Sequence, residues 1–240
     1  MKTIFVTGGA KRIGKAIVEL FSSNGWKVLI HYNNSRTDAE ELADSINSKQ
    51  PETAFTVQGD LDKADEVNNI ISKVDDLTET IDLLVNNAST FYPTPIDDIS
   101  EDHWEKLIGS NLKGPMFLIK GLKQKLKESN GSIINITDTN LSKGVANYSI
   151  YSAAKAGLEA ITKGLARELA PEIKVNAIAP GAMLEPPDVT WTEEQKNKVI
   201  DSIPLKRMGS EKDIAEAVRF LADSDYITGQ IIKVDGGRSL

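Results

Sequence analysis

Residues 3–14 read TIFVTGGAKRIG and place a short apolar run directly before glycines at positions 8, 9 and 14. An apolar run that ends in glycines predicts a β-strand, then a tight turn, and then a helix. Glycine lets the backbone approach a ligand closely, and the N–H groups at the start of the helix can bind a phosphate. A Gly-rich turn that binds nothing would have the same sequence.

The rest of the chain repeats this alternation of short apolar runs with longer amphipathic segments. Strands are expected at 3–7, 27–32, 54–58, 83–86, 132–137, 174–178 and 231–234. Helices are expected at 12–24, 37–49, 63–76, 100–127, 149–169 and 211–223. Strands whose side chains are apolar on both faces, and which alternate with helices along the chain, are typical of a parallel sheet. The sequence therefore predicts one α/β domain over residues 1–240, a Rossmann-type doubly wound parallel sheet of about seven strands with helices on both faces.

Residues 181–204 interrupt the alternation. They contain several prolines and one short amphipathic stretch at 193–201. In a doubly wound sheet ligands bind beside the carboxyl ends of the strands, so an insertion there is expected to be a substrate loop. An ordinary surface excursion is the alternative.

The composition excludes several classes of function. The chain has 240 residues, a net charge of −7 and 40% hydrophobic residues, so a nucleic-acid or anionic-membrane partner is not expected. It has no cysteine and two histidines, so no metal site is expected. The N-terminus runs straight into a strand pattern without the shape of a signal peptide, and no apolar run reaches membrane-spanning length. A cytoplasmic protein is predicted.

A phosphotransferase is the first alternative that the Gly-rich stretch raises. Residues 9–15 fit the pattern G-x-x-x-x-G-K of a P-loop. The next residue is Ala16, where a P-loop needs a Ser or Thr hydroxyl for magnesium. The P-loop interpretation is therefore disfavoured.

The end of the second strand indicates which dinucleotide would bind. An NAD site usually has Asp or Glu there for the ribose 2′-hydroxyl, but residues 31–36 read HYNNSR and the first carboxylate is Asp38. Ser35 and Arg36, with the nearby Lys11, suit a 2′-phosphate instead, so NADP(H) is expected. The alternative is that Arg36 only begins a solvated helix face. After the third strand, Asp60 could accept from an adenine amine or could cap a helix.

Tyr151 and Lys155 carry the candidate chemistry. Residues four apart share a helix face, so the Lys ammonium can lie beside the Tyr hydroxyl and lower its pKa toward neutrality. Such a phenol can act in general acid–base catalysis. Asp138 lies thirteen residues upstream, at a strand end, and a partly buried carboxylate is costly without a partner or a role.

Together these residues resemble the short-chain dehydrogenase/reductase family over essentially the whole chain. The matching positions are residues 7–14, Asn86-Asn87-Ala88, Asn111, Tyr151, Lys155, Asn176, Pro180-Gly181 and residues 234–237. The resemblance implies that Asn87 and Ala88 lie along the cofactor, and that Asn111 helps to hold a water connected to Lys155. It also implies that Tyr151 donates the proton and that Lys155 holds the nicotinamide ribose.

Three departures from the usual family pattern resemble the pteridine reductases, including the bacterial dihydromonapterin reductases. Arg12 replaces the middle glycine of the fingerprint, Ser89 replaces a glycine after Ala88, and Asp138 replaces the usual catalytic serine. The stretch 86–95, NNASTFYPTP, is also similar to that subgroup. The resemblance implies an NADPH-dependent reductase that transfers hydride to a dihydropteridine, such as dihydrobiopterin or dihydromonapterin, to give the tetrahydro form.

The resemblance also implies a set of binding residues. The expected cofactor contacts are Gly8, Lys11, Arg12, Ile13, Gly14, Tyr32, Asn33, Ser35, Arg36, Asp60, Leu61, Asn87, Ala88, Ser89, Tyr151, Lys155, Pro180 and Gly181. The expected pterin contacts are Arg12, Ser89, Phe91, Asp138, Tyr148, Tyr151 and Met183. Phe91 would stack on the pterin and Tyr148 would touch it, although Phe91 could be a core residue and Tyr148 a packing residue.

The resemblance further implies a homotetramer, with helices 100–127 and 149–169 as interface candidates. Two alternatives remain open. The first is a short-chain reductase of a carbonyl substrate, such as a 3-ketoacyl thioester or a sugar, in which Asp138 is merely tolerated. The second is a dinucleotide-sensing protein without turnover, which would not need Asn111, Tyr151 and Lys155.

Overall fold

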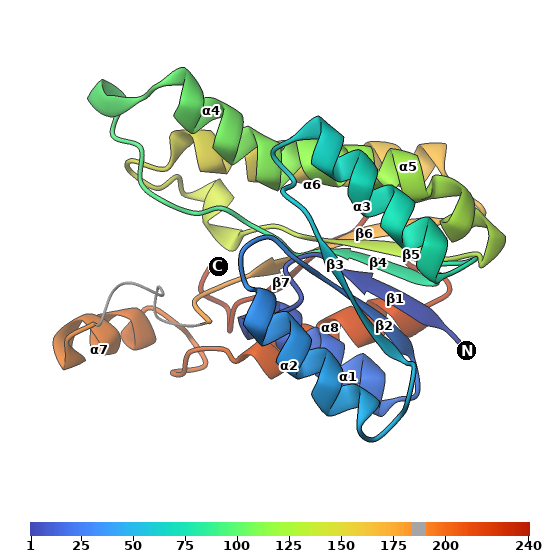
Figure 1. The fold of residues 1–240 in the computed structure, drawn as a ribbon. Helices are drawn as coiled ribbons and strands as arrows, with labels where there is room; N and C mark the ends of the chain where they lie inside the picture. Colours follow the sequence, from blue (N-terminus) through green and yellow to red (C-terminus); the bar gives the residue numbers. More distant parts are fainter. Residues whose placement is uncertain (184–190) are drawn as a thin grey trace.

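A parallel β-sheet forms the middle layer of the protein (Figure 1). The computed structural model describes residues 1–183 and 191–240, and in these residues the sheet has seven strands in the order β3-β2-β1-β4-β5-β6-β7. The strands are β1 (Thr3–Val6), β2 (Lys27–Tyr32), β3 (Ala54–Gln58), β4 (Leu83–Asn86), β5 (Ser132–Ile136), β6 (Lys174–Pro180) and β7 (Ile231–Val234). The predicted α/β class is thereby confirmed.

The order of the strands reverses around β1. This strand pairs in parallel with β2 on one side, where Thr3 lies opposite Lys27, and with β4 on the other, where Ile4 lies opposite Leu83. The chain thus builds outward in both directions from the middle of the sheet. At such a reversal the loops that leave the two central strands diverge and open a crevice at the carboxyl edge of the sheet.

Helices cover both faces of the sheet, with α1, α2 and α8 on one side and α3, α5 and α6 on the other (Figure 1). The helices are α1 (Arg12–Ser23), α2 (Arg36–Asn47), α3 (Ala64–Leu77), α4 (Glu101–Ile108), α5 (Gly114–Glu128), α6 (Ser149–Glu168), α7 (Glu193–Asp201) and α8 (Glu211–Asp223). Successive side chains of β1 point to opposite faces. Ile4 and Val6 join the core with α1, α2 and α8, whereas Phe5 joins the core with α3 and α5.

The prediction of one continuous helix at 100–127 is wrong at its middle, where the helix is interrupted. A π-helical turn, η2 (Gly109–Lys113), separates α4 from α5, and the N–H of Gly114 donates to the carbonyl of Gly109 five residues earlier. Pro115 follows, and proline cannot donate the hydrogen bond that a continuous helix needs. A Cβ at Gly109 would lie 3.0 Å from Asp62, and one at Gly114 would lie 2.8 Å from Leu61, so the turn presses against the loop after β3.

The stretch 193–201, predicted to be amphipathic, is helix α7. Two 3₁₀ turns complete the described elements, η1 (Ile96–Asp98) and η3 (Thr139–Ser142). Of the predicted substrate loop at 181–204, residues 184–190 lie outside the described residues. The prediction of a single domain and of a substrate loop stays a prediction.

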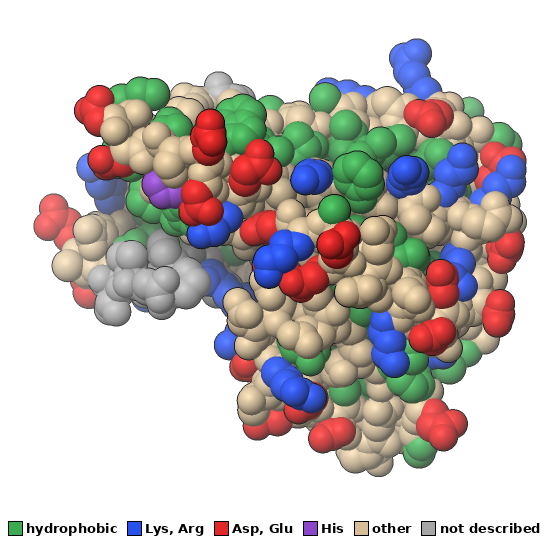
Figure 2. Space-filling view, turned by 45° about the horizontal axis from the view of Figure 1, so that its top comes forward, with side chains coloured by type: hydrophobic (Ala, Val, Ile, Leu, Met, Phe, Trp, Pro, Cys, Tyr) green, Lys and Arg blue, Asp and Glu red, His purple; other side chains and the backbone are tan. Residues whose placement is uncertain are grey.

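The outer surface of the helical layer carries several exposed apolar side chains. Trp104 of α4 and Met116 and Phe117 of α5 are all exposed. Figure 2 shows hydrophobic side chains gathered on this side of the molecule among Lys, Arg, Asp and Glu. No helix in residues 1–183 and 191–240 is long and apolar enough to cross a membrane.

Candidate active site

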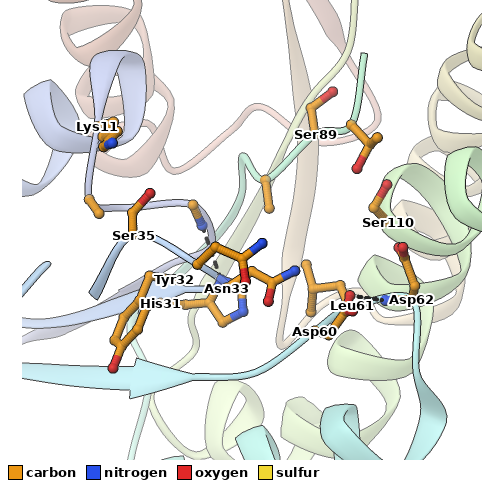
Figure 3. Close-up of a pocket in the computed structure, with 15 residues that line it drawn as sticks. Lys11, His31, Tyr32, Asn33, Ser35, Asp60, Leu61, Asp62, Ser89 and Ser110 are labelled. Atoms are coloured by element: carbon orange, nitrogen blue, oxygen red, sulfur yellow. Dashed lines mark hydrogen bonds between the residues drawn. The ribbon is translucent and has the colours of Figure 1, made fainter. Parts of the chain in front are cut away.

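A pocket of about 320 Å³ opens in the crevice beside β1 (Figure 3). It is formed by the turn after β1, the end of β2, the segments that follow β2, β3 and β4, and one residue of η2. The lining residues are Gly8, Ala10, Lys11, His31, Tyr32, Asn33, Asn34, Ser35, Asp60, Leu61, Asp62, Ala88, Ser89, Thr90 and Ser110. Nine of the predicted cofactor contacts are therefore brought together here, from four separate segments of the chain.

The glycines at the start of α1 are required by geometry. Gly8 has a φ of +60°, and a Cβ there would lie 3.0 Å from the Cα of Ala88. A Cβ at Gly14 would overlap the carbonyl oxygen of Gly8. Arg12 also has a positive φ, 49°, at the position where the resemblance implies a glycine. The turn is thus held in a conformation that glycine adopts freely and that arginine adopts at some cost.

A hydrogen-bond network ties this turn to the loop after β4. The Thr7 hydroxyl accepts from the backbone N–H groups of Asn87 at 2.9 Å and Ala88 at 3.0 Å. The Asn87 carboxamide donates to the carbonyls of Thr7 at 2.9 Å and Gly8 at 3.1 Å. The two central loops are therefore fixed to each other before any ligand binds.

His31 supports the turn from the other side, a role that the sequence did not reveal. Its Nδ1 accepts the N–H of Gly8 at 3.1 Å (Figure 3). Its Nε2 lies 3.0 Å from the carbonyl of Gly59. Burial lowers the pKa of His31 to about 4, so the ring is neutral near pH 7 and Nε2 carries the proton. The only hint in the sequence was a histidine inside an apolar strand.

The cations expected at the 2′-phosphate are both engaged with carboxylates of α2. Lys11 Nζ lies 2.9 Å from Asp38, and Arg36 Nε donates to Glu40 at 2.7 Å. Lys11 and Ser35 line the pocket, whereas Arg36 is outside its lining and its side chain is 73% exposed. Pairs this exposed are weak, so a phosphate can compete for either cation.

The loop after β3 contributes two carboxylates, Asp60 and Asp62, to the lining of the pocket. Asp60 accepts the N–H of Asp62 at 3.1 Å and lies 3.4 Å from Lys63, so it shapes this loop as well as lining the pocket. Among the described residues, Asp62 Oδ1 is buried without a hydrogen-bond partner. Burial, and secondly the charge of Asp60, raise the pKa of Asp62 to about 6. Leu61, between them, is buried.

The candidate catalytic residues meet at the carboxyl end of β5. Tyr151, in the first turn of α6, donates its hydroxyl to Asp138 Oδ2 at 3.0 Å. The other carboxylate oxygen, Oδ1, accepts the backbone N–H of Asn140 at 2.7 Å. Lys155 Nζ donates to the carbonyl of Ile136 at 2.9 Å and lies 5.9 Å from the centre of the Tyr151 ring. The predicted trio is therefore close together.

The protonation of this trio differs from the expectation. Burial, and secondly the charge of Asp138, raise the pKa of Tyr151 above its ordinary value, while Ser89 has a smaller effect in the opposite direction. Burial lowers the pKa of Lys155 to about 8, against an opposing effect of Asp138. The expected lowering of the Tyr151 pKa by Lys155 is thus wrong for this structure, because burial and the nearby Asp138 carboxylate both favour the neutral phenol. Tyr151 is a neutral phenol, which can donate a proton.

Asn111 lies in the π turn and holds the loop after β4. Its Oδ1 accepts from the Ser89 hydroxyl at 2.7 Å, and its Nδ2 donates to the carbonyls of Thr90 and Leu107, both at 2.9 Å. π turns are frequent at functional sites because they redirect side chains. The structure shows this positioning role, and the water expected between Asn111 and Lys155 stays a prediction.

Three aromatic rings form one wall of the site. Phe91 stacks on Tyr148, with ring centres 4.5 Å apart and an interplanar angle of 15°. It meets Tyr151 edge to face at 4.8 Å. Phe91 is 51% exposed, which argues against the alternative that it is a core residue. A flat ligand could stack on such a surface.

The end of β6 and the segment after it are held by hydrogen bonds to β7 and to η3. The N–H of Gly181 donates to the carbonyl of Val234 at 3.0 Å, and the carbonyl of Pro180 accepts from the Thr139 hydroxyl at 3.1 Å. Met183, predicted to touch the substrate, is buried in the core beside Gly209. The structure therefore gives Met183 a packing role.

Comparisons with known proteins agree with this architecture. The family model described as enoyl-(acyl carrier protein) reductase matches residues 8–239. A 3-oxoacyl-[acyl-carrier-protein] reductase of Staphylococcus epidermidis is 37% identical over 240 residues, covering 98% of both chains. A 3-oxoacyl-[acyl-carrier-protein] reductase of Synechocystis is 38% identical over 239 residues, covering 97% of this chain and 94% of the relative. Pteridine reductase 1 of Leishmania tarentolae is 34% identical over 281 residues, covering 98% of this chain and 95% of the relative.

Similarity of this degree along nearly the whole chain agrees with the parallel sheet and with the pairing of Tyr151 and Lys155 on α6. The chain therefore belongs to the short-chain dehydrogenase/reductase family of oxidoreductases.

Proposed function

We propose that the protein is an NADPH-dependent pteridine reductase that transfers hydride to a dihydropteridine and yields the tetrahydro form. The observation that carries the proposal is the hydrogen bond of 3.0 Å between Tyr151 and Asp138. Asp138 stands where the family resemblance implies a serine. A serine hydroxyl serves a substrate carbonyl, whereas a carboxylate can accept N–H groups of a heterocycle and assist in moving a proton.

The residues present fit a nicotinamide dinucleotide. The turn at Gly8 and Gly14 leaves no room for side chains, so a pyrophosphate could approach the backbone closely at the start of α1. The pocket next to this turn, lined by Tyr32, Asp60 and Leu61, suits an adenosine. When bound, NADPH supplies the hydride. Lys155 would hold the nicotinamide ribose, as the family resemblance implies.

Lys11, Ser35 and Arg36 support NADPH over NADH. All three follow β1 or β2 at the phosphate end, and the strand end itself carries no carboxylate. A 2′-phosphate offers more negative charge than either Asp38 or Glu40 and can take over their cations.

The hydrogen bond between Tyr151 and Asp138 supports Tyr151 as the source of the proton. Neutral Tyr151 donates its hydroxyl proton to the ring nitrogen beside the carbon that receives hydride. Asp138 accepts from an N–H group of the pterin and holds the Tyr151 hydroxyl in position. Lys155, protonated below pH about 8, stabilises the tyrosinate that forms.

The aromatic wall and Arg12 suit the pterin ring. Phe91 presents an exposed face on which a flat heterocycle can stack, with the nicotinamide on the other side of the ring. Arg12 can donate to the pterin carbonyl and to the cofactor phosphate. Ser89 can hydrogen-bond the edge of the ring.

Reduction of a 3-oxoacyl thioester is the second candidate, and similarity over the whole chain favours it. The Staphylococcus and Synechocystis 3-oxoacyl reductases are 37% and 38% identical to the chain, against 34% for the pteridine reductase. In this candidate Tyr151 protonates the substrate carbonyl oxygen, and Asp138 has no direct contact with the substrate.

One experiment separates the candidates. The purified protein is given NADPH with dihydrobiopterin or dihydromonapterin, and in parallel with 3-oxoacyl thioesters and simple ketones. The proposal expects turnover of the dihydropteridines to exceed that of every carbonyl substrate in kcat/KM. Robust thioester reduction without pterin turnover would overturn the proposal and leave the second candidate.

We also propose that the protein is a single-domain, cytoplasmic homotetramer. The exposed apolar side chains of α4 and α5 support an interface at the helices that the resemblance implies. Light scattering of the purified protein measures the assembly directly, and a monomer would reject this part of the proposal.

A further inference from the structure

A second pocket, of about 170 Å³, lies beside η3, the 3₁₀ turn that follows Asp138. It brings together η3, the end of α7 and the C-terminal segment. Its lining residues are Thr139, Asn140, Lys143, Ser202, Arg238 and Ser239. All six side chains are polar, and two of them are cationic.

The two cations are held in place by hydrogen bonds between distant parts of the chain. Lys143 Nζ donates to the carbonyl of Arg238 at 2.7 Å. Arg238 Nε donates to the Ser202 hydroxyl at 3.2 Å. These bonds leave further N–H donors on both side chains. The pocket therefore contains a guanidinium and an ammonium that are partly pre-positioned.

The positive charge of the pocket is not neutralised by the described part of the chain. None of the six described lining residues is acidic, and no described carboxylate forms an ion pair with Lys143 or Arg238. The neighbouring carboxylates have other partners. Asp235 accepts the N–H groups of Gly237 and Ser239, at 2.9 and 2.8 Å, and Asp201 lies 3.9 Å from Lys206.

This pocket is connected to the catalytic carboxylate through a single turn. Asn140 lines the pocket and donates its backbone N–H to Asp138 at 2.7 Å. The Thr139 hydroxyl donates to the carbonyl of Pro180, so the same turn is fixed to the end of β6. A substrate whose ring lies at Asp138 could therefore extend a side chain toward the cations.

We infer that Lys143 and Arg238 form a subsite for an anionic group at the end of the substrate's side chain, a carboxylate or a phosphate. The inference rests on the proposed function, because it places the pterin ring at Asp138 and the side chain in this pocket. Guanidinium groups bind carboxylate and phosphate through paired hydrogen bonds, and an ammonium adds a point charge. The protein would then favour pteridines that carry an acidic tail over those that carry a neutral one.

The test compares substrates that share a ring and differ in the tail. Dihydrobiopterin has a neutral tail, dihydrofolate ends in carboxylates, and dihydroneopterin phosphate ends in a phosphate. The variants are Lys143→Gln and Arg238→Gln, with Arg238→Lys as the conservative change. Lys212→Gln, which removes an exposed cation at the start of α8, is the matched control. The measurement is the ratio of kcat/KM for each acidic substrate to that for dihydrobiopterin.

We expect this ratio to fall about tenfold in each Gln variant, to recover partly in Arg238→Lys, and to stay unchanged in Lys212→Gln. A fall for dihydrofolate alone assigns the subsite to carboxylates, and a fall for the phosphate alone assigns it to phosphates. Ratios that match wild type in both Gln variants, for both acidic substrates, would overturn the inference while the pteridine reductase proposal stands.

Failure of the proposed function has a different signature. If no pterin is turned over, the same variants are tested with a 3-oxoacyl phosphopantetheine thioester and with a 3-oxoacyl N-acetylcysteamine thioester, which lacks the phosphate. The measurement is then the ratio of kcat/KM for the phosphopantetheine thioester to kcat/KM for the N-acetylcysteamine thioester. A fall of this ratio in the Gln variants would support the anion subsite and reject a pterin as the substrate. A ratio that is unchanged in the Gln variants would reject both the anion subsite and the pteridine reductase proposal.

Discussion

The hydroxyl of Tyr151 donates to Asp138 at 3.0 Å, although the two residues belong to different elements of the fold. Asp138 follows β5, whereas Tyr151 lies in the first turn of α6. Burial of the phenol, and secondly the nearby Asp138 anion, raise the Tyr151 pKa and keep its proton in place. A hydrogen-bond donor and an acceptor are therefore aligned at the carboxyl end of β5 in the structure without a ligand.

Tyr151→Phe tests the donor. We expect turnover to fall by about 10²- to 10⁴-fold, which is the usual contribution of a general acid. The fold and NADPH binding should persist, because the ring still packs against Phe91 and only the hydroxyl is lost. Steady-state kinetics measure the loss, and cofactor fluorescence measures binding. Activity within a few-fold of wild type would show that the proton comes from Tyr148 or from water.

Asp138→Ser tests the pterin assignment. A serine cannot supply a carboxylate to the ring, so dihydropteridine reduction should fall sharply. Weak ketone reduction should persist or increase, because serine is the donor that the family resemblance implies for carbonyl substrates. Asp138→Asn is the control for shape, since it keeps the size and the acceptor oxygen but loses the charge. Equal loss of pterin and ketone turnover in both variants would mean that Asp138 only supports the fold.

Lys155 sets the expected pH dependence. Burial lowers its pKa to about 8, so the ammonium is present below that pH and is lost above it. Because the proposed mechanism needs the cation, kcat/KM should decline as the pH rises, with a midpoint near 8. In Lys155→Arg the side chain keeps its charge, so the alkaline decline should disappear even if the overall rate is lower. A wild-type profile that stays flat well above this midpoint would contradict the prediction.

Arg36→Ala tests the cofactor preference. Wild type should prefer NADPH over NADH by about tenfold or more in kcat/KM. Arg36→Ala should reduce this preference and leave NADH turnover nearly unchanged, because NADH has no 2′-phosphate. Arg219→Ala removes a similarly paired arginine, which lies 2.6 Å from Glu216 on α8, and should change neither value. Equal kcat/KM for the two cofactors in wild type would reject the assignment.

Asp62 should destabilise the protein at neutral pH. Its pKa of about 6 is above the ordinary 3.8, so the folded state binds the proton more tightly than the unfolded state. The free energy of unfolding therefore has its full value below pH about 4, where Asp62 is protonated in both states. It decreases as the pH rises toward 6, because the unfolded state releases the proton first. Asp62→Asn should raise Tm at pH 7 and approach wild type near pH 4. Asp44→Asn, on the exposed face of α2, is the matched control for the change from Asp to Asn.

The strands were predictable because the sheet is buried on both faces. Each strand is then a short, nearly continuous apolar run, and the expected and observed strands differ by at most two residues, at the end of β6. The π turn could not be predicted in this way. One wider turn hardly changes the apolar spacing of a long helix, and only Gly109, Gly114 and Pro115 hinted at it.

The site was predictable where it depends on local spacing. Tyr151 and Lys155 share a helix face through their separation alone, and Asp138 marks the end of the strand before that helix. The support by His31 depends on contacts to Gly8 and Gly59, which lie in the segments that follow β1 and β3. The protonation of Tyr151 depends on burial and on the final distance to Asp138, which no spacing in the sequence contains.

The π turn at Gly109–Lys113 rotates the apolar face of α5 relative to that of α4, along what would otherwise be one helix. Each residue advances an α-helix by about 100°, so a wider turn offsets the apolar stripe after it from the stripe before it. Leu107 of α4 can thereby pack with Tyr151 while Leu118 of α5 packs against the sheet. Gaining or losing one residue in this turn would rotate one stripe against the other. The length of this segment is therefore under a stricter constraint than the identity of most of its side chains.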